Sequence, residues 1–240
     1  MVEFSLEGYS QLLSAFKDKD YIFCQFEEID ARLAEERPFV LLRHDIDISL
    51  RPALEVARIE YEQGIQATYF VLLRSPFYNV LSRSNAEILS EIQSYGHQIA
   101  PHLDLTFYDN DWTTALMEVE VFAKLYPYIN TRLVSLHSSY DLQYMPIDVC
   151  PQLNNVYGSA VRGDVAYISD STGRWRYGEP LGSKAFNARK PIQLLTHPIW
   201  WFQEGETAPQ KLERWLYSDY HHNRATLKEF LPKLFQLKEQ

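Results

Sequence analysis

Short apolar runs alternate with amphipathic stretches along most of this chain, and this alternation constrains the fold more than any other feature. The run "FVLLRH" at 39–44 is short and continuously apolar before its two basic residues, which is typical of a buried strand. The stretch 50–64 has helical spacing, with Pro52 in its first turn and Gly64 at its end. Repeated strand–helix units imply parallel strands joined by crossover helices. We therefore predict an α/β fold, either a barrel or an open doubly wound sheet.

The same patterns predict the remaining elements. An N-terminal helix is expected with Ser5 as its cap, and one long or two short helices are expected at the C-terminal end. The expected strands are 66–73, 97–103, 132–137, 164–171 and 192–197, and the expected helices are 5–16, 84–96, 111–126 and 208–235. The 240 residues contain no low-complexity linker or internal repeat, so we predict a single domain over 1–240 with an N-terminal helical extension and C-terminal helices.

Composition excludes several classes of function. Hydrophobic residues make up 46% of the chain, which is enough for a large core, and the formal net charge of −9 disfavours nucleic acid or an anionic membrane as the main partner. No segment has the ~20 apolar residues that a membrane span needs. The N-terminus lacks the pattern of a secretory signal, and Cys24 and Cys150 form no zinc or redox motif. We expect a cytoplasmic protein with reduced thiols.

Polar side chains gather where the predicted strands end. The segments "HDID", "HLD", "LHSS", "SDS" and "THP" each follow a predicted strand. In parallel α/β folds, ligands bind beyond the carboxyl ends of the strands. The sequence therefore predicts a functional site that is assembled from several strand ends.

The pair Asp45 and Asp47 is the most informative part of this pattern. Residues two apart in an extended segment face the same way, so both carboxylates can point into one pocket while His44 faces the other side. Two close carboxylates need a shared proton, an arginine or a divalent metal to relieve their repulsion. His102 and His137 end other predicted strands, and imidazole and carboxylate are common metal ligands. The alternative is structural, because an aspartate after a strand can also cap the following helix.

Five segments in this order resemble the polysaccharide deacetylases of the NodB-homology type, carbohydrate esterase family 4. They are "RHDID", "GHQIAPHLD", "SLHSSYD", "YISDSTGRW" and "IQLLTHP", and they extend over most of the chain. The first segment is the variant in which one apolar residue separates the two acids. The resemblance implies a distorted (β/α) barrel and a hydrolase that removes N-acetyl groups from amino sugars.

The resemblance also implies roles for individual residues. Asp45 corresponds to the general base and Asp47 to a metal ligand. His102 corresponds to a second ligand. His197 corresponds to the catalytic acid, which Asp170 would orient. The implied cofactor is one divalent metal ion, with zinc as the first expectation and iron, nickel or cobalt as alternatives.

Two positions depart from the family pattern. The second metal histidine usually follows the first by four residues, where this chain has Thr106, and the arginine of the third segment is replaced by His137. His137 could supply the missing ligand, which gives the set Asp47, His102 and His137. Asp104 is the alternative third ligand, because it could share a face with His102.

The substrate contacts are predicted from aromatic and charged residues near these segments. By the resemblance, Trp175 would form a wall of the sugar site. Trp200 or Trp201 would line the cleft, because aromatic rings stack on sugars, and the other would pack in the fold. Arg43 would pair with a neighbouring acid or contact the substrate.

A cytoplasmic location suggests a nucleotide- or lipid-linked N-acetylated saccharide, used in the biosynthesis of a surface polysaccharide such as O-antigen or capsule. Two rival hypotheses remain. The same scaffold could hydrolyse another non-peptide C–N bond, or the chain could bind a glycan or a partner without turnover. The sequence gives no indication of the oligomeric state.

Overall fold

The protein is described by a computed structural model that covers residues 2–35, 37–109, 111–137, 154–157, 165–176 and 178–233. The chain divides into two compact units, Met1–Phe202 and Gln203–Gln240, and all the site residues discussed below lie in the first. Cys150 and the part of "SLHSSYD" that follows His137 lie outside the described residues.

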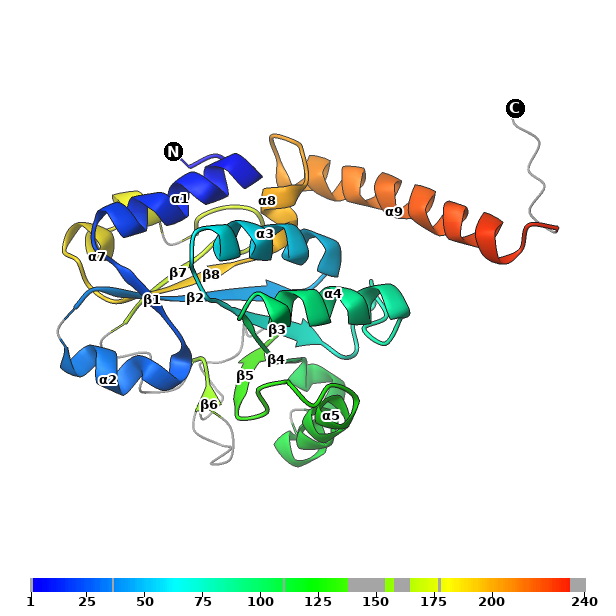
Figure 1. Ribbon diagram of the computed structural model, residues 1–240, viewed down its shortest axis with the longest axis horizontal. Coiled ribbons are helices and arrows are strands. Elements are labelled where there is room, and N and C mark those ends of the chain that lie inside the picture. Colours follow the sequence, from blue (N-terminus) through cyan, green and yellow to red (C-terminus); the bar gives the residue numbers. More distant parts are fainter. Residues whose placement is uncertain are drawn as a thin grey trace. The chain divides into compact units, whose positions relative to one another are not determined.

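The first unit is built on a parallel sheet, and helices alternate with most of its strands along the chain (Figure 1). The strands pair in the order β6-β5-β4-β3-β2-β8-β7, and β1 pairs with the first half of β2. The strands are β1 (Ile22–Cys24), β2 (Phe39–Ile46), β3 (Thr68–Leu72), β4 (Gln98–Leu103), β5 (Leu133–Leu136), β6 (Asn154–Asn155), β7 (Ala166–Ser169) and β8 (Ile192–Thr196).

The helices connect the strands as crossovers. Every strand pairing is parallel, as expected when helices join successive strands. The helices are α1 (Leu6–Asp18), α2 (Ile29–Ala34), α3 (Leu50–Glu62), α4 (Arg83–Ser94), α5 (Trp112–Leu125), α7 (Lys184–Asn187), α8 (Pro198–Phe202) and α9 (Ala208–Phe230). The α/β fold predicted from the sequence is confirmed, as a curled parallel sheet that forms a distorted, incomplete (β/α) barrel. In the described part of the chain no pairing joins β6 to β7.

β2 lies at the centre of the sheet, between β3 and β8, and all eight of its residues are buried. A strand covered on both faces is expected to be continuously apolar, and β2 follows this rule until Arg43. α3 starts directly after the strand end, following Ser49, and stops before Gly64, which has a φ of 69°. Glycine adopts this left-handed conformation readily. Gly64 therefore allows the tight turn between the end of α3 and β3.

Helices form at both ends of the chain where the sequence predicts them. The Ser5 hydroxyl accepts a hydrogen bond from the Gly8 amide at 3.0 Å and caps α1 as predicted. The C-terminal stretch forms one long helix, α9, of 23 residues after the short α8. None of the helices in the described residues combines the length and the apolar character needed to cross a membrane.

Candidate active site

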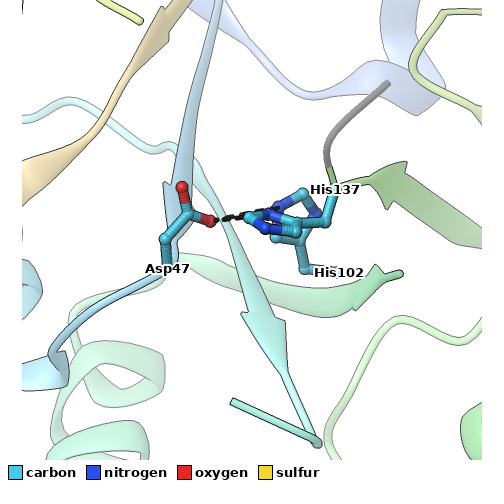
Figure 2. A group of neighbouring side chains, drawn as sticks. All are labelled: Asp47, His102 and His137. Carbon is cyan, nitrogen blue, oxygen red and sulfur yellow. Dashed lines mark hydrogen bonds and ion pairs between the residues drawn. The ribbon is translucent and has the colours of Figure 1, made fainter. Parts of the chain in front are cut away.

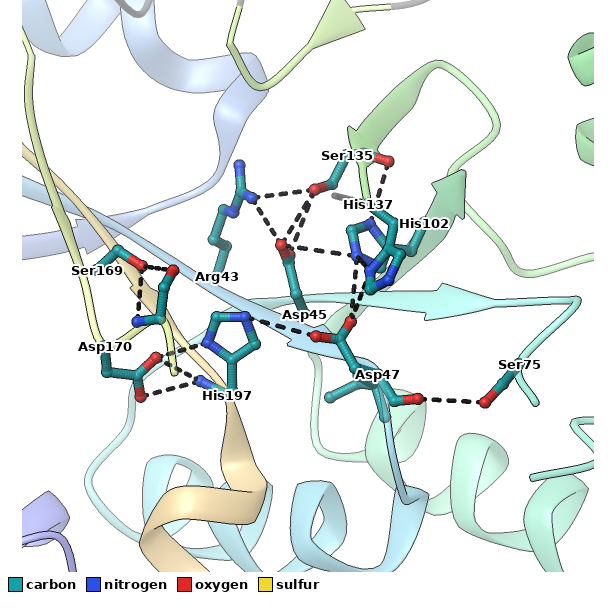
Figure 3. Close-up of polar contacts among 12 residues, drawn as sticks. Arg43, Asp45, Asp47, Ser75, His102, Ser135, His137, Ser169, Asp170 and His197 are labelled. Atoms are coloured by element: carbon teal, nitrogen blue, oxygen red, sulfur yellow. Dashed lines mark hydrogen bonds and ion pairs between the residues drawn. The ribbon is translucent and has the colours of Figure 1, made fainter. Parts of the chain in front are cut away.

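The carboxyl end of β2 brings two carboxylates to one side of the sheet (Figure 3). His102, at the end of β4, contacts both of them, because its Nε2 lies 3.8 Å from Asp45 Oδ2 and 3.3 Å from Asp47 Oδ1. The alternation of side chains along β2 therefore acts as predicted, with Asp45 and Asp47 in one pocket. Burial acts to raise the pKa of Asp47, but its contacts with His102 and His137 outweigh burial and hold that pKa well below its usual value.

Three potential ligand atoms converge at this point (Figure 2). Asp47 Oδ1 lies 3.3 Å from His102 Nε2 and 3.2 Å from His137 Nδ1, and the two ring nitrogens lie 3.3 Å apart. With zinc–ligand bonds of ~2.0–2.1 Å, two ligands of a tetrahedral ion lie ~3.3–3.4 Å apart. The observed triangle therefore has the size that a divalent ion would require.

Two further observations support the fit to a metal. Asp47 Oδ1 is buried, and among the described residues no contact to it has the geometry of a hydrogen bond, although the two ring nitrogens lie 3.2 and 3.3 Å away. His102 Nδ1 donates to the Ser135 carbonyl oxygen at 3.2 Å, so in the neutral ring the lone pair lies on Nε2, toward Asp47. A main-chain bond of this kind commonly fixes the tautomer of a metal-binding histidine. The residues present thus fit a metal ion.

The two other polar candidates near β4 are engaged elsewhere. Asp104 accepts hydrogen bonds from the amide and the hydroxyl of Thr106 at 3.0 and 2.6 Å, and so caps a short 3₁₀ turn. His97 uses both ring nitrogens on main-chain groups, at 3.1 and 3.0 Å. Of the two alternatives for the third ligand, the structure brings His137 to the cluster and Asp104 to its own turn.

His197, at the end of β8, is partly buried and pairs with the fully buried Asp170 at the end of β7. Its Nδ1 lies 2.6 Å from Asp170 Oδ1, and its main-chain N–H donates to both carboxylate oxygens at 3.0 Å. Burial acts to lower the pKa of His197, but Asp170, followed by Asp47 and Asp45, raises it to about 9. The other ring nitrogen, Nε2, faces Asp47 Oδ2 at 3.7 Å. At neutral pH this imidazole is therefore protonated, with one N–H directed toward the two acids.

Trp201 completes the support of Asp170. Its Nε1 donates to Asp170 Oδ2 at 2.9 Å, and its side chain is buried. The sequence left open which of the two adjacent tryptophans packs in the fold, and the structure gives this position to Trp201. Trp200 instead lines a small pocket together with Asp45, Asp47, Ser49 and His197.

Trp175 lies beside this aromatic group. Its ring stacks on Phe4, with centroids 5.5 Å apart, and lies 5.9 Å from the ring of Trp201. It is not among the residues that line the pocket of Trp200. The structure thus places Trp175 against the N-terminal segment, and its role as a wall of a sugar site stays a prediction.

Asp45 is held by Arg43 of its own strand and by Ser135 of β5. Arg43 Nη2 lies 2.8 Å from Asp45 Oδ2, and Ser135 Oγ lies 3.3 and 3.4 Å from the two carboxylate oxygens. Burial acts to raise the pKa of Asp45, but Arg43, His102 and His197 outweigh it and hold that pKa below its usual value. The guanidinium is fully buried, which favours the predicted pairing with an acid over contact with substrate.

Ser135 is a residue that the sequence reasoning missed. It precedes His137 by two positions, so the alternation of β5 places both on one side of the sheet. The signal was therefore present in "LVSLH", but a single serine in an apolar strand does not by itself indicate a function.

The opposite face of β2 carries a second polar cluster. His44 Nδ1 lies 2.7 Å from Thr196 Oγ1, and its Nε2 lies 2.7 Å from Glu60 Oε1. Glu60 also accepts hydrogen bonds from the hydroxyls of Tyr9 and Tyr69. Burial acts to raise the pKa of Glu60, but these contacts, led by His44, hold it below the usual value. This cluster cross-links the two strands that carry Asp45 and His197 from behind, as expected for a histidine that faces away from the pocket.

Comparisons with known proteins do not establish a family for this chain. No protein-family model matches the chain, and no curated protein matches it. Among solved structures, the chitin deacetylase from the fungal pathogen Colletotrichum lindemuthianum is similar with a TM-score of 0.33 and 19% sequence identity, over 42% of this chain and 46% of that chain. The chain thus spans less than half of the fungal enzyme, and at this level the similarity does not bear on its activity.

Proposed function

We propose that this protein is a divalent-metal-dependent hydrolase that removes the N-acetyl group from an amino sugar, as a member of the polysaccharide deacetylase family that its motifs resemble. One observation supports the proposal above all others. Next to the ligand triangle of Asp47, His102 and His137 lie a carboxylate, Asp45, 3.8 Å from His102 Nε2, and a protonated imidazole, His197, 3.7 Å from Asp47 Oδ2. Amide hydrolysis needs an activated water, a base on one side of the scissile bond and an acid on the other.

The ligand set would hold one ion through a carboxylate and two neutral imidazoles. Such a donor set suits zinc, and iron, nickel or cobalt are alternatives. When bound there, the ion would supply Lewis-acid chemistry, by making water more acidic and by polarising the acyl carbonyl. Asp47 is the only carboxylate of the triangle, which leaves Asp45 for proton transfer.

Asp45 would act as the general base. Its lowered pKa keeps the carboxylate ionised at neutral pH, and it lines the same pocket as Asp47. It is therefore able to accept a proton from the attacking water. Its own position is fixed by hydrogen bonds within the sheet, so little reorganisation accompanies the transfer.

His197 would act as the general acid. Its Nδ1 is bound by Asp170, so the proton that can be transferred is the one on Nε2, which faces the pocket acids. Donation of this proton to the leaving nitrogen would release a free amine. Asp170 holds the ring orientation throughout, and Trp201 holds Asp170.

For the substrate we keep the class that the sequence led us to expect. We propose an N-acetylated sugar that is nucleotide- or lipid-linked and is processed in the cytoplasm during surface polysaccharide biosynthesis. Trp200, buried at the pocket wall beside His197, would provide the aromatic surface against which a sugar ring packs.

Product analysis tests this function. The zinc-loaded protein is incubated with a panel of N-acetylated sugars and sugar nucleotides, and acetate and free amine are quantified together. We expect equal amounts of both from the wild type, none from Asp47→Ala, and unchanged amounts from the matched carboxylate variant Asp104→Asn. Ammonia or an amine formed without acetate would indicate hydrolysis of another C–N bond. A metal-loaded protein that binds sugars without any product would indicate a binding protein.

A further inference from the structure

The guanidinium of Arg43 is enclosed in the sheet directly beside the proposed base. Its side chain is fully buried, and its Nη2 donates to Asp45 Oδ2 at 2.8 Å, to Ser135 Oγ at 3.0 Å and to Tyr157 OH at 2.7 Å. With the Gln193 amide turned to satisfy its neighbours, the amide oxygen accepts from Nη1 at 3.0 Å. The cation also lies 4.6 Å from the centre of the Tyr157 ring.

A buried guanidinium stays charged and needs a nearby anion, because transfer of an unpaired charge from water into a protein costs several kcal/mol. Asp45 is the carboxylate that Arg43 contacts among the described residues. The remaining contacts are neutral groups, namely a serine, a tyrosine and an amide. The charges of Arg43 and Asp45 therefore neutralise each other. Removing either charge would leave the other buried without a counter-charge.

The pairing also fixes the geometry of the carboxylate. Arg43 and Asp45 are two residues apart on β2, whose residues are all buried, and β2 is hydrogen-bonded on both sides by β3 and β8. The guanidinium thus cannot move independently of the strand that carries the base. We propose that Arg43 is the positioning residue of Asp45, and that it holds this carboxylate oriented toward the ligand triangle. This inference rests on the proposed function, in which Asp45 is the base.

This assignment explains why β5 is free to supply a metal ligand. The motif resemblance expects an arginine after β5 to hold the base, and this chain has His137 there. In the structure the cation comes instead from β2 itself (Figure 3), and β5 provides Ser135 for the base and His137 for the triangle.

Three variants test the positioning role in the full-length, zinc-loaded protein. Arg43→Met removes the charge but keeps an unbranched buried chain, Arg43→Lys restores a cation, and Arg58→Met removes an arginine that pairs with Glu55 and Glu91 on α3 and α4. Metal content, kcat and KM are measured for each. We expect Arg43→Met to lose roughly 100-fold in kcat, the size expected when a reacting group is displaced by about 1 Å, with KM unchanged and the metal retained.

The controls separate positioning from other roles. Arg43→Lys should recover a measurable part of kcat, Arg58→Met should match the wild type, and Arg43→Met should cause no further loss in an Asp45→Asn background. Loss through KM with unchanged kcat would instead mean that Arg43 contacts substrate, and would overturn the proposal. So would an unchanged kcat in Arg43→Met.

A second measurement does not depend on turnover. Urea unfolding of the metal-free protein is compared for the wild type, Arg43→Met, Asp45→Asn and the double variant. We expect Asp45→Asn to shift the unfolding equilibrium by roughly 100-fold when Arg43 is present and by far less in the Arg43→Met background. Additive effects would refute the pairing. If the coupling is found but the wild type hydrolyses no substrate, the proposed function fails while the pairing of Arg43 with Asp45 stands.

Discussion

The Asp170→Asn variant isolates the feature that makes His197 an acid. In the wild type the pKa of His197 is raised to about 9, although burial acts to lower it, and Asp170 is the largest of the opposing influences. Relative to the usual value of about 6.5, this corresponds to roughly 3 kcal/mol in favour of the imidazolium. Asparagine removes the charge and keeps one of the two acceptor oxygens, so His197 or Trp201, but not both, retains its acceptor. We therefore expect the pKa of His197 to fall below about 7 in the variant, since burial then meets only the more distant Asp47 and Asp45.

The assay is an NMR titration of the histidine rings in EDTA-treated protein between about pH 5 and pH 10, with His197→Gln to assign the signal. The sign of the linked stability follows from the same shift. A histidine whose pKa is raised in the folded state stabilises the fold fully below its unfolded value of about 6.5, and this contribution is lost as pH rises through about 9. Asp170→Asn should therefore lose stability at pH 6 and little at pH 10. A His197 pKa that is equal in both proteins would refute the reasoning.

Four further variants test other parts of the account. His137→Ala should weaken zinc affinity by more than ~100-fold in calorimetric titration, because removing a ligand costs more affinity than removing a group that supports a ligand. Asp104→Ala should leave zinc affinity within about threefold. If Asp104→Ala weakened zinc binding more than His137→Ala, Asp104 would be the third ligand. Asp45→Asn should keep the metal and lower kcat by roughly 10²–10⁴-fold, and loss of the metal instead would exchange the roles of Asp45 and Asp47. Glu60→Gln should cost roughly 2–3 kcal/mol in urea unfolding at pH 7, because buried donors lose a charged acceptor. The pKa of Glu60 is lowered in the fold. The ionised Glu60 carboxylate therefore stabilises the fold above its unfolded pKa of about 4.3, and this stabilisation is lost as pH falls through the folded pKa. A stability difference between wild type and Glu60→Gln that grows on acidification would contradict this prediction.

The strand–helix alternation was sufficient to predict the fold class and the location of the site. "FVLLRH" became β2, and the helix predicted after it became α3, ending before Gly64 as expected. The sequence reasoning did not find β1 (Ile22–Cys24) or α2 (Ile29–Ala34). β1 has only three residues and is stabilised by its pairing with β2, and hydrophobic periodicity gives no signal over so short a length.

At the site, the sequence could not decide which residue is the third potential ligand, for a specific structural reason. Asp104 would share the face of His102 if β4 continued, but β4 ends at Leu103 and the Asp104 carboxylate turns to the Thr106 amide. The choice of His137 over Asp104 therefore depends on a strand end that the sequence does not mark. The side-chain alternation that was applied to Asp45 and Asp47 extends equally to Arg43, which is why its place beside the base could have been predicted.

Other contacts depend on tertiary packing alone. Trp201 reaches Asp170 from α8, a helix of five residues, and Tyr157 reaches Arg43 from beyond β6. Neither contact has a sequence spacing that indicates it. The identity of such partners becomes visible only when the sheet brings distant strand ends together.

The central claim is that Asp47, His102 and His137 form a metal site, and metal content measures it most directly. The purified, tag-free protein and its Asp47→Ala variant are compared by inductively coupled plasma mass spectrometry after incubation with zinc, iron, nickel and cobalt in turn and removal of excess ion. The account predicts about one ion per wild-type chain and loss of that ion in the variant. A wild-type chain that stays empty with every metal, or a variant that keeps the ion, would contradict it.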